Sequence, residues 1–119
     1  MKNIVIVDDD LLFCEIARDQ FSAAYNIVVF NHGSEAFEFI KNNTFDLLIT
    51  DILLPGQDGF EIIQMVKDEK KTTKVIAVSG GGSIASESYL DLAKRFGVDY
   101  TYSKQSPITE LTEIVNDIL

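Results

Sequence analysis

The stretch IVIVDDDLLF, residues 4–13, places three consecutive aspartates between two apolar runs. Its first four residues are branched and apolar, which is typical of a strand buried on both faces of a sheet. The apolar residues after the aspartates open a segment with helical spacing. A parallel strand that leads through a short turn into a helix is the repeating unit of an α/β fold. The stretch therefore fits one such unit, and it raises the question of why carboxylates gather where a buried strand ends.

Length and composition indicate one globular domain over residues 1–119. Of the 119 residues, 46% are hydrophobic and 24% are charged, and a domain of this size buries about two thirds of its unfolded surface. The net charge of −9 opposes nucleic-acid backbones and anionic membranes, so we expect neither as a partner. A short N-terminal apolar run and a single cysteine, Cys14, lead us to expect a cytoplasmic protein.

Strand and helix patterns alternate along the whole chain. Runs rich in branched or aromatic apolar residues predict strands at 3–7, 27–30, 45–50, 74–78 and 98–102. A segment with helical spacing follows each strand. We therefore expect a flavodoxin-like, doubly wound, five-stranded parallel sheet in the order 2-1-3-4-5, covered by five helices as a three-layer sandwich.

Turn and cap residues support these boundaries. The expected breaks after the third and fourth strands are Pro55, Gly56, Gly59, Gly80, Gly81 and Gly82. Gly97 is expected to end the fourth helix. Ser106 is expected to be the N-cap of the last helix, with Pro107 in its first turn.

The residues that follow the strands predict a site. In doubly wound sheets, ligands bind beyond the carboxyl ends of the strands, near the point where strand order reverses. The first and third strands are neighbours in the expected order, so Asp8, Asp9 and Asp51 should converge there. Ser79 follows the fourth strand and Lys104 the fifth, which places both beside the acids.

Such a cluster favours a bound cation and phosphoryl chemistry. Two carboxylates about 4 Å apart repel by something like 4 kcal/mol at an effective dielectric of 20. Oxygen ligands alone favour Mg²⁺, or Mn²⁺, over zinc. With a cation, an ammonium and a hydroxyl around it, a carboxylate can attack phosphorus. We expect Asp51 to be this nucleophile, Asp8 and Asp9 to hold the metal, and Asp10 to cap the next helix.

Four motifs together resemble the receiver domain of two-component response regulators, in its stand-alone form. They are IVIVDDD with Asp8 and Asp9, LLITDILLPGQDGFE with Asp51, VIAVSGGG with Ser79, and YTYSK with Lys104. Each motif alone is weak. All four occur in order, each at a predicted strand end, and the resemblance covers the whole chain.

The resemblance implies a phosphorylation-dependent switch in a phosphorelay. A histidine kinase or phosphotransfer protein would supply the phosphoryl group to Asp51, and no enzymatic activity is implied beyond the chain's own phosphorylation and autodephosphorylation. The implied Mg²⁺ ligands are Asp8, Asp9, Asp51 and the backbone carbonyl of Leu53. Ser79 and Lys104 would bind phosphoryl oxygens. Their movement would shift the face made by the fourth helix, fifth strand and fifth helix toward a downstream target or output domain.

The C-terminal part departs from the family pattern at two positions. Thr101 stands where the family generally carries a switch Tyr or Phe, and Tyr100 and Tyr102 should point to the opposite face. Gln105 follows the lysine where the family usually has a proline in a cis bond, and a cis bond here would cost about 3 kcal/mol. Both departures favour an alternative: a degenerate receiver that acts as a phosphorylation-independent interaction module.

Three other interpretations fit parts of the chain. A haloacid dehalogenase-type phosphohydrolase would use Asp8 and Asp10 as a DxD pair, but it needs further acids where this chain has Ser79 and glycines. A flavodoxin-like nucleotide binder would cradle a phosphate at the loop that is acidic here. The VSGGGS segment lacks the lysine and the spacing of a P-loop.

Overall fold

The protein is described here from a computed structural model that covers residues 1–54, 58–80 and 84–119, with side chains outside 84–89. The strands are β1 (Asn3–Val7), β2 (Asn26–Phe30), β3 (Leu47–Asp51), β4 (Lys74–Ser79) and β5 (Tyr100–Ser103). The helices are α1 (Leu11–Phe21), α2 (Gly33–Asn42), α3 (Gly59–Glu69), α4 (Ile84–Arg95) and α5 (Ile108–Ile118).

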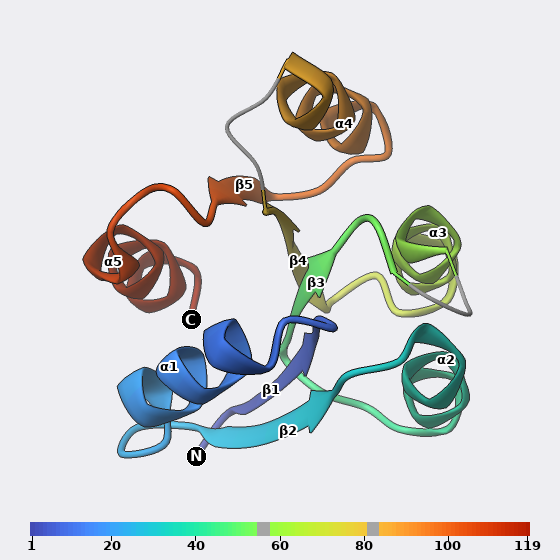
Figure 1. Cartoon of the computed structure of the whole chain (residues 1–119). Helices are drawn as coiled ribbons and strands as arrows, with labels where there is room; N and C mark the ends of the chain where they lie inside the picture. Colours follow the sequence, from blue (N-terminus) through green and yellow to red (C-terminus); the bar gives the residue numbers. More distant parts are fainter. Residues whose placement is uncertain (55–57, 81–83) are drawn as a thin grey trace.

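The strands form one parallel sheet in the order β2-β1-β3-β4-β5. Helices α1 and α5 cover one face of the sheet, and α2, α3 and α4 cover the other (Figure 1). The predicted fold class, strand order and three-layer arrangement are therefore confirmed. Within the described residues, no helix is both long and apolar enough to cross a membrane.

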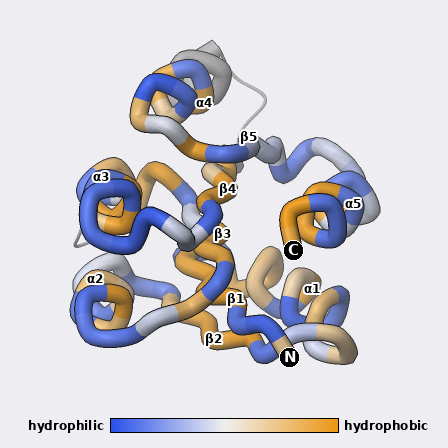
Figure 2. The backbone as a smooth tube through the Cα atoms, turned by 180° about the vertical axis from the view of Figure 1, so that it is seen from behind, coloured by the Kyte–Doolittle hydropathy of each residue, from blue (hydrophilic) through white to orange (hydrophobic). Residues whose placement is uncertain are grey.

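The core lies in two layers that are separated by the sheet. Alternation along β1 sends Ile4 and Ile6 toward α1 and α5, and Val5 and Val7 toward α2 and α3. Strands β1 to β4 are apolar along most of their length, whereas β5, with the sequence YTYS, is not (Figure 2). Because both faces of the sheet are buried, polar side chains are placed mainly beyond the strand ends.

Helix ends follow the expected signals with one correction. Asp10 caps α1, with its Oδ1 accepting a hydrogen bond from the Phe13 amide at 3.1 Å. Gly97 follows α4 with a φ of 86°, a conformation that glycine adopts without strain. The prediction that Ser106 is the N-cap of α5 is wrong, because Pro107 occupies that position. The expected breaks at Pro55, Gly56, Gly81 and Gly82 lie outside the described residues.

Four strands, β2 to β5, differ from their predicted bounds by one or two residues at an end, and the differences in β3 and β5 bear on the site. The third strand extends to Asp51, so this side chain projects from the strand itself. The fifth strand begins at Tyr100, where the Asp99 amide still donates a main-chain hydrogen bond to the Val75 carbonyl oxygen at 2.9 Å, while the Asp99 side chain takes the place of a main-chain acceptor for the Val75 amide. The Val75 amide donates a hydrogen bond to Asp99 Oδ2 at 2.8 Å, and Lys67 forms an ion pair with the same oxygen at 3.0 Å.

Candidate functional site

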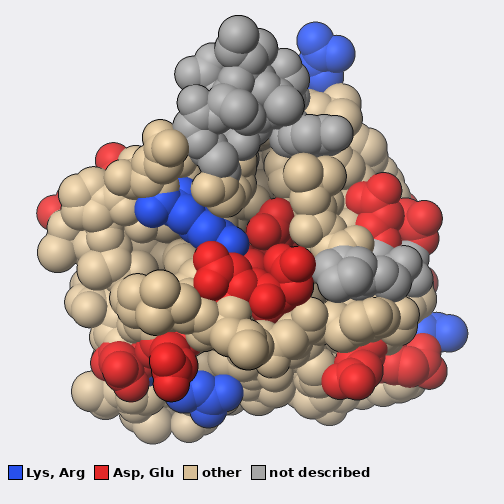
Figure 3. Space-filling view, viewed as in Figure 1, with Lys and Arg blue, Asp and Glu red and all other residues tan. Residues whose placement is uncertain are grey.

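The carboxyl ends of β1 and β3 bring three acidic side chains together. Asp8 and Asp9 follow β1, Asp51 ends β3, and one carboxylate oxygen from each lies within 4.8 Å of the others. Val7 of β1 is paired with Thr50 of β3, so the residues after these two positions meet at one edge of the sheet. Acidic side chains occupy the centre of this face, with a basic side chain beside them (Figure 3). The predicted convergence of the three acids is confirmed.

Asp8 is the innermost acid of the site, with a side chain that is fully buried. Its Oδ1 accepts hydrogen bonds from the Asp10 amide and from Lys104 Nζ, both at 2.9 Å. Its Oδ2 lies 2.8 Å from the same ammonium as an ion-pair contact, but it receives no hydrogen bond from the described residues. Burial raises the pKa of Asp8 to about 6, and the nearby Asp51 adds to the rise.

The next two residues, Asp9 and Asp10, are exposed, unlike Asp8, and their carboxylates have different roles. Asp9 is exposed and directs its carboxylate to the shared cluster. Asp10 is also exposed, and its role as the helix cap holds its pKa below the usual range, mainly through the hydrogen bond from Phe13. The structure thus separates the three consecutive acids into two that face Asp51 and one that caps α1, as predicted.

Asp51, the predicted phosphoryl acceptor, is only 7% exposed. Its Oδ1 accepts a hydrogen bond from the Leu53 amide at 2.9 Å, and its Oδ2 lies 3.4 Å from Lys104 Nζ. Burial raises the pKa of Asp51, while the Leu53 amide and Lys104 oppose the rise. Gly59 is required next to this residue, because a Cβ there would lie 2.6 Å from the Asp51 carbonyl oxygen. The role of the Leu53 carbonyl as a metal ligand stays a prediction.

Lys104 reaches from the end of β5 across to the acids. Its Nζ contacts Asp8, Asp51 and Asp10, the last at 3.5 Å, and lies 4.9 Å from the centroid of the Phe13 ring. Burial by itself would lower the pKa of Lys104, but its contacts with the carboxylates, Asp8 first, raise the pKa overall. The lysine therefore stays charged and partly neutralises the cluster.

Ser79 ends β4 beside Lys104 and is 4% exposed. The Lys104 amide donates a hydrogen bond to the Ser79 carbonyl oxygen at 2.9 Å, which ties the two strand ends together. The structure therefore places both predicted phosphoryl-binding residues at the same edge of the sheet as the acids. Their contact with a phosphoryl group stays a prediction.

The two departures from the family pattern lie next to this edge. Thr101 is half-buried and pairs with Ala77, whose side chain packs in the core layer below α4. Tyr102 packs in the opposite layer, and the Tyr100 hydroxyl bonds to Asp117 of α5, so both tyrosines point away from Thr101 as predicted. Among the described residues no peptide bond is cis, and Lys104 to Gln105 is therefore trans.

One residue near the site was missed by the sequence analysis. Asn31 directly follows β2, and its Nδ2 donates a hydrogen bond to the Asp8 carbonyl oxygen at 3.0 Å. The sequence pattern that marks the other site residues was also present here, because Asn31 is a polar residue directly after a predicted strand, at the same edge of the sheet. Residues after the other four strands were predicted as site residues, and Asn31 was not.

The donor set fits a hard divalent cation. The cluster offers carboxylate oxygens alone, and the buried Oδ2 of Asp8 has an ion-pair contact with Lys104 but no hydrogen bond from the described residues, which leaves it able to face a cation. Cys14 lies close by but is a poor ligand, because burial raises the pKa of its thiol to about 11 and its S–H donates to the Asp8 carbonyl at 3.4 Å. These features suit Mg²⁺ or Mn²⁺ better than zinc.

Comparisons with known proteins agree with this geometry. The chain is 28% identical over 86 residues to the response regulator receiver protein CpdR of Brucella abortus, covering 71% of this chain and 72% of CpdR. It is 29% identical to the regulator of RpoS of Escherichia coli, over 95% of this chain but only 32% of that protein.

A solved structure extends the likeness to the whole fold. The response regulator TrrA of Thermotoga maritima, in complex with Mg²⁺ and BeF, has a TM-score of 0.85 and 28% identity, and the match covers 100% of both chains. The family model of the response regulator receiver domain matches residues 4–116. The chain therefore belongs to the response regulator receiver domain family.

Proposed function

We propose that this chain is a phosphorylation-dependent switch of a two-component phosphorelay, in which Asp51 accepts the phosphoryl group of a phosphohistidine. One observation carries the proposal. Asp51 ends a buried strand with two further acids within 4.8 Å and the Lys104 ammonium 3.4 Å away. A nucleophilic carboxylate beside groups that can neutralise phosphoryl oxygens is what such a transfer needs.

The transfer itself requires little beyond positioning and charge neutralisation. A carboxylate oxygen of Asp51 forms a bond to phosphorus, the bond between phosphorus and the histidine nitrogen breaks, and that nitrogen keeps the electron pair. Asp8, Asp9, Asp51 and the Leu53 carbonyl are the proposed ligands of Mg²⁺, or of Mn²⁺. When bound, the cation neutralises negative charge shared between the carboxylates and the phosphoryl oxygens.

Two residues of the chain would hold the transferred group. Lys104 already lies over the acidic cluster with its charge retained, so it is placed to contact a phosphoryl oxygen on Asp51. Ser79, at the neighbouring strand end, would donate its hydroxyl to another oxygen. If Lys104 and Ser79 contact the phosphoryl group better in one conformation of the chain than in the other, phosphorylation would shift the population toward that conformation.

The output surface is the face made by α4, β5 and α5. Lys104 and Ser79 lie at the ends of β5 and β4, so inward movement of either would act on this face. Thr101, rather than an aromatic side chain, would be the switch residue there. The partners proposed are a histidine kinase or phosphotransfer protein and a downstream protein target, in the cytoplasm, with no direct contact with nucleic acid or membrane.

The test is labelling with acetyl phosphate and Mg²⁺, followed by intact mass measurement. We expect a gain of about 80 Da, one phosphoryl group. The gain should disappear in Asp51→Asn and persist in Asp19→Asn, which changes an exposed aspartate on α1. Absence of the gain in the wild type, or its survival in Asp51→Asn, would show that Asp51 is not the acceptor.

The second candidate function is a receiver that binds its partner without phosphorylation. Thr101 and the trans bond before Gln105 favour it, because both depart from the family pattern where the signal would be reported. The same experiment separates the two functions, since this candidate predicts no gain in mass.

A further inference from the structure

Residues at the carboxyl end of β2 form hydrogen bonds with both the main-chain amide and the main-chain carbonyl of Asp8. The Asp8 amide donates a hydrogen bond to the Phe30 carbonyl oxygen at 3.0 Å. In return, Nδ2 of Asn31 donates to the Asp8 carbonyl oxygen at 3.0 Å. Two consecutive residues of β2 and its turn therefore fix the peptide units before and after Asp8, although β2 contributes no side chain to the acidic cluster.

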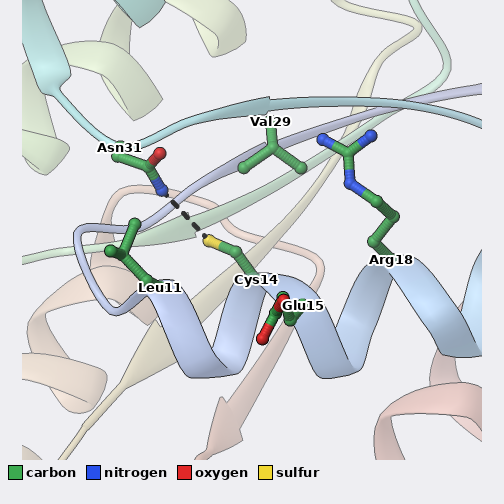
Figure 4. Close-up of a pocket in the computed structure, with 6 residues that line it drawn as sticks. All are labelled: Leu11, Cys14, Glu15, Arg18, Val29 and Asn31. Atoms are coloured by element: carbon green, nitrogen blue, oxygen red, sulfur yellow. Dashed lines mark hydrogen bonds between the residues drawn. The ribbon is translucent and has the colours of Figure 1, made fainter.

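A thiol completes this arrangement from the side of α1. The Cys14 S–H donates to the same Asp8 carbonyl at 3.4 Å, and Asn31 Nδ2 lies 3.5 Å from Cys14 Sγ. Figure 4 shows Asn31 approaching from the end of β2 and Cys14 from α1, with their side chains directed at each other. The Asp8 carbonyl is thus satisfied by two side chains from different elements.

The outer side of this contact is open. A pocket of about 420 Å³ lies between α1 and β2, and it is lined by Leu11, Cys14, Glu15, Arg18, Val29 and Asn31 (Figure 4). Asn31 is itself exposed, so packing on this side does not hold its amide in place. The position of the amide depends on its hydrogen bonds to Asp8 and Cys14.

We infer that Asn31 is a positioning residue for the metal ligand Asp8, and that the end of β2 thereby sets the affinity of the acidic cluster for Mg²⁺. The inference rests on the proposed function, because it assumes that Asp8 holds the ion. Fixing the Asp8 carbonyl fixes the direction in which its side chain leaves the main chain. Groups that orient a ligand without touching the metal commonly change affinity by about ten- to a hundredfold.

The test is direct Mg²⁺ binding, measured by calorimetry with the metal alone. For Asn31→Ala we expect affinity about three- to tenfold weaker than the wild type, below the usual range because the bond goes to the main chain of the ligand. The matched control is Asn26→Ala, at the other end of β2, where the amide bonds to Asn3 Oδ1 at 3.1 Å, far from the acids. This control should bind Mg²⁺ as the wild type does.

A second measurement separates positioning from a general loss of structure. The rate of labelling by acetyl phosphate should fall in Asn31→Ala at low Mg²⁺ and return to the wild-type rate at saturating Mg²⁺. A variant that is only destabilised would show a lower melting temperature without Mg²⁺ and an unchanged affinity. If Asn31→Ala does not fold, Asn31→Leu, which keeps the volume without a donor, should show the same weakened binding.

The outcomes distinguish the inference from the proposed function. If the wild type binds Mg²⁺ and Asn31→Ala binds it equally well, Asn31 has no positioning role and the proposed function stands. If the wild type binds no Mg²⁺, both fail. Equal weakening in Asn31→Ala and Asn26→Ala would also overturn the inference, because the effect would then belong to β2 as a whole.

Discussion

The two halves of the site differ in how closely their side chains are held. In the acidic half, at the ends of β1 and β3, each buried carboxylate accepts at least one main-chain hydrogen bond, from Asp10 to Asp8 and from Leu53 to Asp51. In the half at β5, Thr101 borders a pocket of about 310 Å³, and Tyr100 is 40% exposed. Lys104 is the residue that joins the two halves.

The proposed function gives a reason for this difference. Phosphoryl transfer depends on reacting atoms within a fraction of an ångström of a productive arrangement, so the acids need fixed directions. A surface that reports the transfer needs two states of similar free energy, and many side chains can supply them. Under the proposed function, the acids are therefore more constrained than Thr101 and Gln105, which depart from the family pattern.

The largest expected effect comes from breaking the link between the halves. Lys104→Met should slow labelling by acetyl phosphate about a hundredfold, because it removes the ammonium that neutralises a phosphoryl oxygen. The rate is measured by intact mass at saturating Mg²⁺, so that weaker metal binding does not contribute. Lys94→Met, which removes an exposed lysine paired with Asp91, should label at the wild-type rate. A rate within threefold of the wild type for Lys104→Met would mean that the acidic half works alone.

The second prediction concerns the pH dependence of the acidic half. The pKa of Asp8 is about 6 in the folded chain, against its ordinary value of 3.8, so the folded state binds more protons than the unfolded state between these limits. The free energy of unfolding contributed by Asp8 should therefore fall as pH rises from about 4 to about 6. Asp8→Asn removes this pH-dependent contribution. As pH rises across that window, the free energy of unfolding of Asp8→Asn should therefore increase by about 2 to 3 kcal/mol relative to that of the wild type.

Chemical denaturation in the presence of a chelator checks this pH dependence. Adding millimolar Mg²⁺ at pH 7 should stabilise the wild type and leave Asp8→Asn nearly unchanged, because only the wild type keeps the ligand. Parallel stability profiles for the two proteins between pH 4 and pH 7 would contradict the raised pKa.

The smallest effects are expected in the half at β5, where the two tyrosines provide a matched pair. The Tyr102 hydroxyl donates to the Ser106 carbonyl at 2.7 Å and its side chain is 3% exposed, so Tyr102→Phe should cost about 1 kcal/mol of unfolding free energy. Tyr100 bonds to Asp117 at the surface, and Tyr100→Phe should cost less than about 0.5 kcal/mol. Equal costs in urea denaturation would show that burial does not make the Tyr102 hydrogen bond stronger than the surface bond of Tyr100.

Much of the fold and of the site could be predicted from local sequence patterns. Buried parallel strands are continuous apolar runs, so β1 and β4 were visible without knowledge of their neighbours. The separation of Asp10 from Asp8 and Asp9 was also predictable, because an acidic residue directly before a helix satisfies free amides there. The Ser106 cap was predicted wrongly, since serine and proline together fit two neighbouring cap positions.

Other features depend on contacts between distant segments. Nothing local to Asp99 indicates that its carboxylate takes the place of a main-chain acceptor for the Val75 amide, 24 residues away. In the same way, the bond from Asn31 to the Asp8 carbonyl joins the residues that directly follow β2 and β1, 23 positions apart. Such contacts depend on the exact register of neighbouring strands.

The sequence by itself determined the order of the elements, the identity of the acids at the strand ends and the family to which these motifs point. These follow from periodicity and residue chemistry, which act over a few neighbouring positions. Only the tertiary structure decided that Asp8 is fully buried with a raised pKa, that Lys104 contacts three carboxylates, and that Asn31 holds the main chain of Asp8. Desolvation and long-range contacts arise only when the strands are packed side by side.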